Sequence, residues 1–106
     1  MLAAVVLASF AERGLAAGDP ARGQALYAVC STCHGLDAKG MKELNAPALA
    51  GREEWYLVRQ IENFRTGRRG SDPNDIYGRQ MAPMALVLAD AQAIEDVAAY
   101  LSSLGD

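Results

Sequence analysis

Apolar residues recur every three or four positions in two long stretches of the chain, which is the pattern of a helix with one buried face. The clearer stretch follows Asp90, which can cap a helix, and it ends before Gly105. The other stretch covers residues 53–66 and ends before Gly67. The apolar stripes consist of Ile94, Val97, Ala98, Leu101 and Leu104 in the first case and of Leu57, Val58, Ile61 and Phe64 in the second. Both stretches are therefore predicted to be main helices of the core.

A third helix is predicted to begin near Asp19 and Pro20, because Asp is a favoured N-cap and Pro suits the first helical turn. It should run through residue 27 into residues 30–34. The segments 35–51 and 67–75 are rich in turn-forming residues and are predicted to be loops, with one short helical turn near residues 75–78. No stretch shows the sustained apolar–polar alternation of a strand. We therefore expect an all-α domain of three main helices plus short helical turns.

The length of 106 residues indicates one domain with a modest core. Just over half of the residues are apolar, largely through alanine, and only 7% are aromatic. Two long loops in so small a domain require an explanation. A large flat cofactor, packed among small side chains and wrapped by the loops, would provide one.

The charge distribution excludes some classes of function. A net charge of −3 argues against a nucleic acid partner, because phosphate binding requires a basic face. No pair of carboxylates suggests acid–base catalysis, and there is neither a Gly-rich phosphate loop nor a nucleophile with a plausible base. Four arginines do lie close together, namely Arg59, Arg65, Arg68 and Arg69. They form either a solvated helix end and loop or a patch that binds a partner or a carboxylate.

The N-terminal segment is apolar over residues 1–11, which is too short to span a bilayer as a helix. It fits the hydrophobic part of a secretion signal, and residues 15–17 provide a cleavage site of small residues. No Lys or Arg precedes the run, however, and Glu12 and Arg13 interrupt it. We therefore interpret residues 1–17 as a signal-peptide remnant or an N-terminal apolar segment, and residues 18–106 as the domain. The alternative is an ordered helix or a short anchor that stays on the protein.

Both cysteines and the only histidine lie within Cys30-Ser31-Thr32-Cys33-His34. A thioredoxin-like redox pair would need a βαβ pattern, and structural zinc would need four ligands where Cys and His supply three. A plain disulfide leaves His34 unexplained. Covalent haem attachment explains all three residues, because each thiol can add across one vinyl group and the next imidazole can bind the iron. One haem c, held through Cys30 and Cys33, is therefore predicted.

The single histidine excludes bis-histidine ligation within this chain. The sixth iron ligand is then a methionine, a lysine, a terminal amine, or absent. Methionine stands out in Met81-Ala82-Pro83-Met84, directly before the last helix. A thioether ligand stabilises ferrous iron and raises the reduction potential. One methionine of this pair could instead be a flexible core filler.

Taken together, these motifs resemble the class I c-type cytochromes, and within them the small bacterial monohaem proteins with His–Met ligation. The resemblance extends over residues 18–104. It rests on Gly23-x-x-x-Tyr27, Cys30-x-x-Cys33-His34, Ala46-Pro47-Ala48-Leu49-Ala50-Gly51, residues 55–60, Met81-Ala82-Pro83-Met84 and residues 96–101. It implies a cytochrome c-like fold in which the three helices and short turns wrap around one covalently bound haem. The first helix would cross the last, and Gly23 would permit their close approach.

The resemblance also implies a role for several residues. His34 would be the proximal iron ligand, and Pro47 would offer its backbone carbonyl to the other ring nitrogen of His34. Leu49 would pack on the haem face. Met81 would be the sixth ligand, with Met84 nearby as packing.

Three residues near the start of the second predicted helix complete the expected cofactor site. Trp55, Tyr56 and Arg59 lie where the family often contacts the haem propionates or closes the pocket. An indole N–H or a guanidinium there could donate to a carboxylate. For the two aromatic residues, ordinary core packing is the alternative.

The resemblance implies a periplasmic one-electron carrier, which is an electron-transfer protein and not an enzyme. Its partners would be redox proteins such as a terminal oxidase, a reductase or a dehydrogenase, and no stable membrane insertion is expected after signal removal. One alternative is a haem subunit or domain of a larger respiratory or dehydrogenase complex, which an exposed apolar patch would favour. Another is a gas-binding haem sensor or a peroxidase-like enzyme with an open sixth position. The methionine pair argues against that second alternative.

Overall fold

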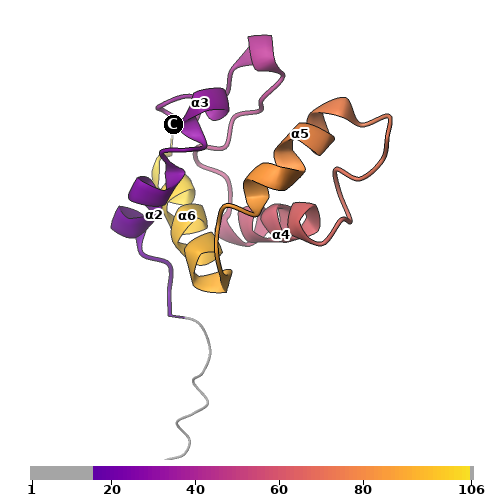
Figure 1. Cartoon of the computed structure of the whole chain (residues 1–106). Coiled ribbons are helices and arrows are strands. Elements are labelled where there is room, and N and C mark those ends of the chain that lie inside the picture. The colour runs from indigo at the N-terminus through magenta and orange to yellow at the C-terminus, as the bar shows by residue number, and fades with distance from the viewer. Residues whose placement is uncertain (1–15, 106) are drawn as a thin grey trace, which may run out of the picture.

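The computed structural model describes residues 16–105 and folds them into helices joined by loops (Figure 1). The elements are α2 (Pro20–Tyr27), α3 (Ser31–His34), the 3-10 turn η2 (Lys42–Leu44), α4 (Glu54–Arg65), α5 (Ile76–Ala85) and α6 (Ala91–Ser103). The β-type pairing found in this range is one isolated bridge between Met41 and Ala46. The all-α fold class is therefore confirmed. The predicted signal-like segment lies outside the described residues, apart from its last two.

Membrane crossing is not supported by any helix of residues 16–105, because none combines the necessary length with the necessary apolar character.

The predicted starts of the first and last helices are confirmed by side-chain caps. The Asp19 carboxylate accepts from the backbone N–H of Ala21 at 3.0 Å, which opens α2. The Asp90 carboxylate accepts from the backbone N–H of Ala93 at 2.8 Å, which opens α6. Such caps satisfy donors that have no partner inside the helix. The predicted boundaries follow from these local bonds.

The segment before the last helix differs from the prediction. A single turn was expected near residues 75–78, whereas α5 is a helix of ten residues. Gly78 and Pro83 lie inside it, and both residue types disfavour helix. Asp75 caps the helix by accepting from the Gly78 N–H at 3.0 Å. Burial of Ala85 and Leu88 in the common core then overrides the weak local propensity.

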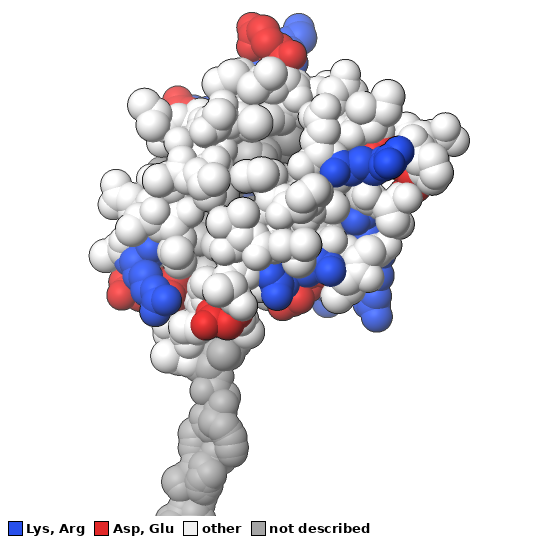
Figure 2. All heavy atoms as spheres, viewed as in Figure 1, with Lys and Arg blue, Asp and Glu red and all other residues white. Residues whose placement is uncertain are grey.

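The charged side chains gather around the rim of the face seen in Figure 2. Between them, the upper part of this face is almost free of charge and contains a hollow, where Figure 1 places α3 on one side and α5 on the other. The surface between these two helices is therefore largely uncharged.

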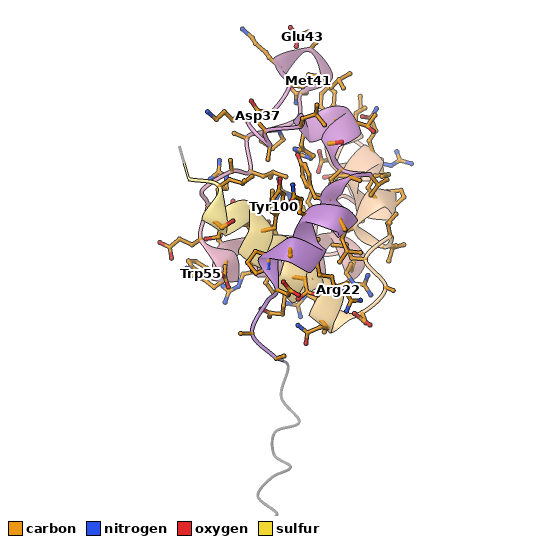
Figure 3. The ribbon with its side chains drawn as sticks, turned by 90° about the vertical axis from the view of Figure 1, so that its left-hand side faces the viewer. Arg22, Asp37, Met41, Glu43, Trp55 and Tyr100 are labelled. Atoms are coloured by element: carbon orange, nitrogen blue, oxygen red, sulfur yellow. The ribbon has the colours of Figure 1, made fainter. Side chains whose placement is uncertain are left out.

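A buried carboxylate joins the start of α2 to α6, beside Arg22, which Figure 3 labels. Asp96 is 1% exposed, and it accepts from the backbone N–H of Asp19 at 2.8 Å and from the Gln92 side chain at 3.1 Å. The Arg22 guanidinium lies 3.5 Å from its other oxygen. The Asp19 N–H, followed by the Gln92 amide and the Arg22 charge, holds the pKa of Asp96 below its usual value against the opposing effect of burial.

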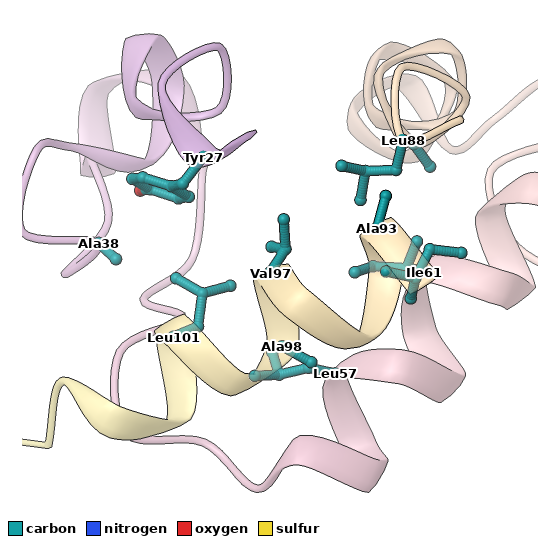
Figure 4. Close-up of a cluster of buried hydrophobic side chains, with 11 residues drawn as sticks. Tyr27, Ala38, Leu57, Ile61, Leu88, Ala93, Val97, Ala98 and Leu101 are labelled. Carbon is teal, nitrogen blue, oxygen red and sulfur yellow. The ribbon is translucent and has the colours of Figure 1, made fainter. Parts of the chain in front are cut away.

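The core is organised around α6, which packs against both α2 and α4 (Figure 4). Val97 and Leu101 of α6 face Tyr27 of α2, while Leu57 and Ile61 come from α4. The Tyr27 and Tyr100 rings lie 5.7 Å apart between centroids. The predicted crossing of the first and last helices is thus confirmed, and it leaves α3 and α5 outside this helix pair.

Candidate functional site

The attachment segment forms one helical turn directly after α2. The backbone N–H groups of Cys33 and His34 both donate to the Cys30 carbonyl, at 3.2 and 3.0 Å. The two thiols are not joined to each other, so the plain disulfide interpretation does not hold in the structure. Burial, with a further contribution from Cys33, raises the pKa of the Cys30 thiol. The two sulfurs and the imidazole therefore project from a single turn, as the spacing predicted.

The His34 ring is buried, with 7% exposure, and its protonation pattern follows from its partner. His34 Nδ1 lies 2.8 Å from the backbone carbonyl of Pro47. A carbonyl can only accept, so Nδ1 must carry the proton and the lone pair of the neutral imidazole lies on Nε2. That is the tautomer required of a metal ligand. The residues present therefore fit a covalently attached haem, while the ligand role of His34 stays a prediction.

The loop after His34 folds back so that Pro47 reaches the imidazole. Gly40 donates its N–H to the His34 carbonyl at 2.9 Å. Ala38 is fully buried with a positive φ of 59°, and its carbonyl accepts from the N–H groups of Leu49 and Ala50. These bonds hold residues 46–50 beside the attachment turn. Leu49 is consequently half-buried against the core.

Tyr27 has a role at this site that the sequence analysis did not identify. Its hydroxyl donates to the Gly35 carbonyl at 2.7 Å, directly after His34. Burial is the main cause of the rise in the Tyr27 pKa, and Cys30 contributes to it. The phenol thus stays protonated and fastens the end of the attachment turn to α2. The Gly23-x-x-x-Tyr27 motif was noted only as part of the resemblance.

The two methionines of the motif both lie on α5, three residues apart, which places them on neighbouring positions of one helix face. Met81 is half-buried, whereas Met84 is 37% exposed. Met81 is thus the less exposed of the two side chains. Its role as an iron ligand stays a prediction.

The aromatic pair at the start of α4 lies at the surface rather than in the core. Trp55 is 59% exposed and is seen at the edge of the molecule in Figure 3, which contradicts the alternative of core packing for this residue. Its indole N–H donates to Glu53 at 2.7 Å, and the Arg59 guanidinium lies 5.5 Å from its ring centroid. Tyr56 packs edge-on against Trp55, with 6.0 Å between centroids. Contacts of these residues with haem stay a prediction.

The four clustered arginines do not form a single patch. Arg65 is half-buried and donates to the backbone carbonyls of Ala85 and Leu88. Arg69 donates to Gln60 at 2.7 Å and lies over the Phe64 ring. Neither interpretation from the sequence foresaw the place of Arg65. The carbonyls that it binds lie 20 and 23 positions away along the chain, so no local pattern indicates them.

A metal site built from protein side chains alone is not supported in residues 16–105, where no group of three His, Cys, Asp or Glu residues could hold an ion. The zinc alternative is therefore not supported by this part of the chain.

The comparisons with known proteins agree on one family. Residues 20–105 match the family model described as cytochrome c. The chain is 40% identical over 90 residues to cytochrome c4 of Stutzerimonas stutzeri, which covers 83% of this chain and 42% of that protein. The crystal structure of reduced recombinant cytochrome c4 from Pseudomonas stutzeri superimposes with a TM-score of 0.64 at 39% identity, over 82% of this chain and 46% of the other.

Two further relatives differ in length. Cytochrome c-554(548) of Halomonas halodenitrificans is 38% identical over 87 residues, which is 82% of this chain and 98% of that protein. A thiosulfate dehydrogenase electron acceptor of Stutzerimonas stutzeri is 40% identical over 75 residues, which is 71% of this chain and 31% of that protein. The chain thus spans less than half the length of the cytochrome c4 relative and nearly all of the shorter one.

Proposed function

The chain belongs to the cytochrome c family and carries one haem c on Cys30 and Cys33, and from this premise we propose that it is a periplasmic one-electron carrier with His34 and Met81 as axial ligands. When bound, the haem supplies the one-electron chemistry by alternating between ferrous and ferric iron. The chain's own residues attach it, orient its ligands and exclude water. An electron carrier, and not an enzyme, is what the names of the relatives indicate.

The observation that carries the proposal is the hydrogen bond between His34 Nδ1 and the Pro47 carbonyl. It fixes one tautomer of a buried imidazole, holds the ring in one orientation, and makes Nε2 a stronger base. Leu49, two residues after Pro47, would pack against the haem face from the same loop. The imidazole is thereby held in the orientation and tautomer that a metal ligand requires.

Met81 is proposed as the opposite ligand because it lies on a helix that the core supports and is less exposed than Met84. A neutral thioether favours the ferrous state and raises the reduction potential. Identical ligands in both oxidation states keep the structural change small when an electron arrives. Met84 would serve as packing beside it.

The start of α4 is proposed to face the carboxylates of the haem. Trp55, Tyr56 and Arg59 offer an indole N–H, a phenol and a guanidinium within five residues. Because Trp55 and Tyr56 are exposed, they are not needed to fill the core and remain available to a ligand.

The location and partners form a further part of the proposal. Residues 1–17 would act as a signal that directs residues 18–106 to the periplasm, with no stable membrane insertion after its removal. Partners would be redox proteins such as a terminal oxidase, a reductase or a dehydrogenase. The relative named as an electron acceptor of thiosulfate dehydrogenase supports a dehydrogenase as one such donor. Docking would be brief and use a small interface.

A second candidate function is a haem domain or subunit of a larger respiratory or dehydrogenase complex. Two observations favour it: the chain spans 42% of the cytochrome c4 relative, and it exposes several large apolar side chains, with Leu36 at 87%. Leu86 and Val87 are also more than half exposed. Such apolar surface is typical of a protein interface. The redox chemistry would be the same, with a permanent partner in place of transient ones.

The test is to produce the chain together with a haem-attachment system, purify it, and determine one haem per chain by the pyridine haemochrome assay. The ferric protein should be low-spin and show a sulfur-to-iron charge-transfer band. High-spin haem that binds carbon monoxide rapidly would instead support the gas-binding sensor. Light scattering of the same sample separates a monomeric carrier from a chain that requires a permanent partner.

A further inference from the structure

The end of α5, the helix that carries Met81, is held by one side chain from α4. Arg65 Nη1 donates to the backbone carbonyl of Ala85 at 3.2 Å and to that of Leu88 at 2.6 Å. The Arg65 side chain is 23% exposed, so water competes little for these bonds. Arg65 thereby links α4 both to the last residue of α5 and to the turn before α6.

This end of α5 needs an external donor because its own hydrogen bonding is weak. Pro83 has no N–H, so the helix lacks one internal bond there. In the last turn the hydrogen bonds join residues three apart instead of four. The Leu86 N–H donates to the Pro83 carbonyl and the Val87 N–H to the Met84 carbonyl, both at 3.1 Å. The last carbonyls of a helix have no internal partner, and a cation beside them is favourable to the helix dipole. The Arg65 guanidinium provides both the donor and the charge.

The turn that Arg65 grips is also fixed by its side chain. Leu88 is buried and points toward Ala93 of α6 and Ile61 of α4 (Figure 4). Its carbonyl is bound by Arg65 at the same time. The turn therefore has little freedom to shift, and neither has the helix end that precedes it.

The other end of α5 is held by close backbone packing. A β-carbon at Gly70 would lie 2.5 Å from the Gly78 carbonyl oxygen, so the loop after α4 touches the first turn of α5. Asp75 caps that turn. Along α5, Met81 lies between this contact and the end of the helix that Arg65 holds by its hydrogen bonds.

We infer that Arg65 is a positioning residue for Met81: by fixing the C-terminal end of α5, it keeps the thioether sulfur in reach of the iron. The inference rests on the proposed His34–Met81 ligation. Without the Arg65 bonds, α5 keeps its first turn but its second half gains freedom. The methionine sulfur then leaves the iron more often, and competing ligands gain access.

The test compares holoproteins of Arg65→Gln and Arg68→Gln. Both substitutions remove one positive charge near the end of α4, but Arg68 is an exposed loop residue. The readouts are the charge-transfer band, the pH midpoint at which this band is lost, and the rate of carbon monoxide binding to the ferrous form. We expect Arg65→Gln to raise the sulfur-free population about tenfold and to lower the midpoint by about one pH unit. Arg68→Gln should stay within about twofold of the unmodified protein.

Two further variants distinguish a positioning role of Arg65 from a general loss of stability. Arg65→Lys keeps a charge and should give an intermediate result, and it replaces Arg65→Gln in the comparison if that variant fails to accumulate with haem. Gln92→Ala loosens the α2–α6 side, because Gln92 binds Asp96 and the Ala16 carbonyl, both of which lie outside α5. If Gln92→Ala weakens the band as much as Arg65→Gln, general destabilisation is the cause and the inference is overturned.

The outcomes also separate the inference from the proposed function. If the unmodified holoprotein lacks the sulfur-to-iron band, the proposed ligation fails, and the inference with it. If the unmodified protein has the band but Arg65→Gln and Arg65→Lys behave like Arg68→Gln, the ligation stands and the positioning role of Arg65 is refuted.

Discussion

Gly23 of α2 lies directly against the backbone carbonyl of Asp96 of α6. A β-carbon at Gly23 would overlap that oxygen and would lie 2.9 Å from the β-carbon of Tyr100. α6 cannot move away, because Val97 is 2% exposed and holds it in the core. The approach of the first and last helices therefore depends on the absence of one methyl group.

We predict that Gly23→Ala lowers the free energy of unfolding by about 3 kcal/mol. Alanine is the better helix former by about 1 kcal/mol, so it would raise the free energy of unfolding if the helix had space for it. A decrease therefore indicates the close contact. Urea denaturation of the holoprotein, followed by circular dichroism, measures the effect. Ala21→Gly, at an exposed position of α2, is the control and should cost about 1 kcal/mol. A Gly23→Ala variant as stable as the unmodified protein would contradict the close contact.

The Asp96 carboxylate should make stability depend on acid pH. Its pKa is lowered in the folded state, chiefly by the Asp19 N–H, so the folded protein favours the ionised form more than the unfolded chain does. The stabilisation is complete above the ordinary carboxyl pKa and is lost as the pH falls through the lower folded value. We predict that Asp96→Asn costs about 2 kcal/mol at pH 7 and progressively less in acid. Denaturation midpoints measured from pH 7 down to about pH 2, through the range below the ordinary carboxyl pKa, test this. Glu43→Gln, a surface substitution in η2, should show no such trend.

The loop that delivers Pro47 to His34 should be sensitive to a side chain at Gly40. A β-carbon there would lie 2.8 Å from the Ala46 carbonyl oxygen and 2.9 Å from the Pro47 carbonyl carbon. We predict that Gly40→Ala costs about 3 kcal/mol or more, and that it weakens the His34 Nδ1–H hydrogen bond, seen as a shifted or exchanging imidazole proton signal in the NMR spectrum.

The matched control for Gly40 is Gly67. Both glycines have a strongly positive φ, 91° and 81°, but nothing lies within 4 Å of a β-carbon at Gly67. Gly67→Ala should therefore cost only the conformational strain, about 1–2 kcal/mol, and leave the His34 signal unchanged. Equal effects of the two substitutions would show that backbone strain, and not contact with the Pro47 loop, is responsible.

The two methionines of α5 should respond differently to truncation. Met81→Ala is expected to give high-spin or misligated haem with a lowered reduction potential, because it removes the proposed thioether ligand. Met84→Ala should keep the low-spin spectrum and lose only packing. Optical spectra and a potentiometric titration of both variants decide the matter. If the two results were exchanged, Met84 would be the ligand and the carrier function would still stand.

Local chemistry explains why much of the fold could be predicted from the sequence. Asp19 and Asp90 cap α2 and α6 through bonds only a few residues away, and the apolar stripe of α6 forms the centre of the core. The spacing of Cys30, Cys33 and His34 is likewise a property of one helical turn. Each of these features is contained within a short window of the chain.

The features that the sequence did not reveal depend on distant contacts. The length of α5 could not be predicted, because Gly78 and Pro83 disfavour helix and the compensating burial of Leu88 comes from the whole fold. In the sequence, Arg65 cannot be distinguished from its solvated neighbours, because the carbonyls that it binds lie 20 and 23 positions away. The hydrogen bond of His34 to Pro47 was expected only through the family resemblance.

The pairing of α2 with α6 has a consequence for biosynthesis. The ribosome completes α2 and the adjoining thiols long before α6, so the first helix has no partner while the rest of the chain is being made. Contacts so far apart in sequence require the closure of a long loop, which slows folding. The two ends of the domain can therefore pair only after nearly the whole domain has been synthesised.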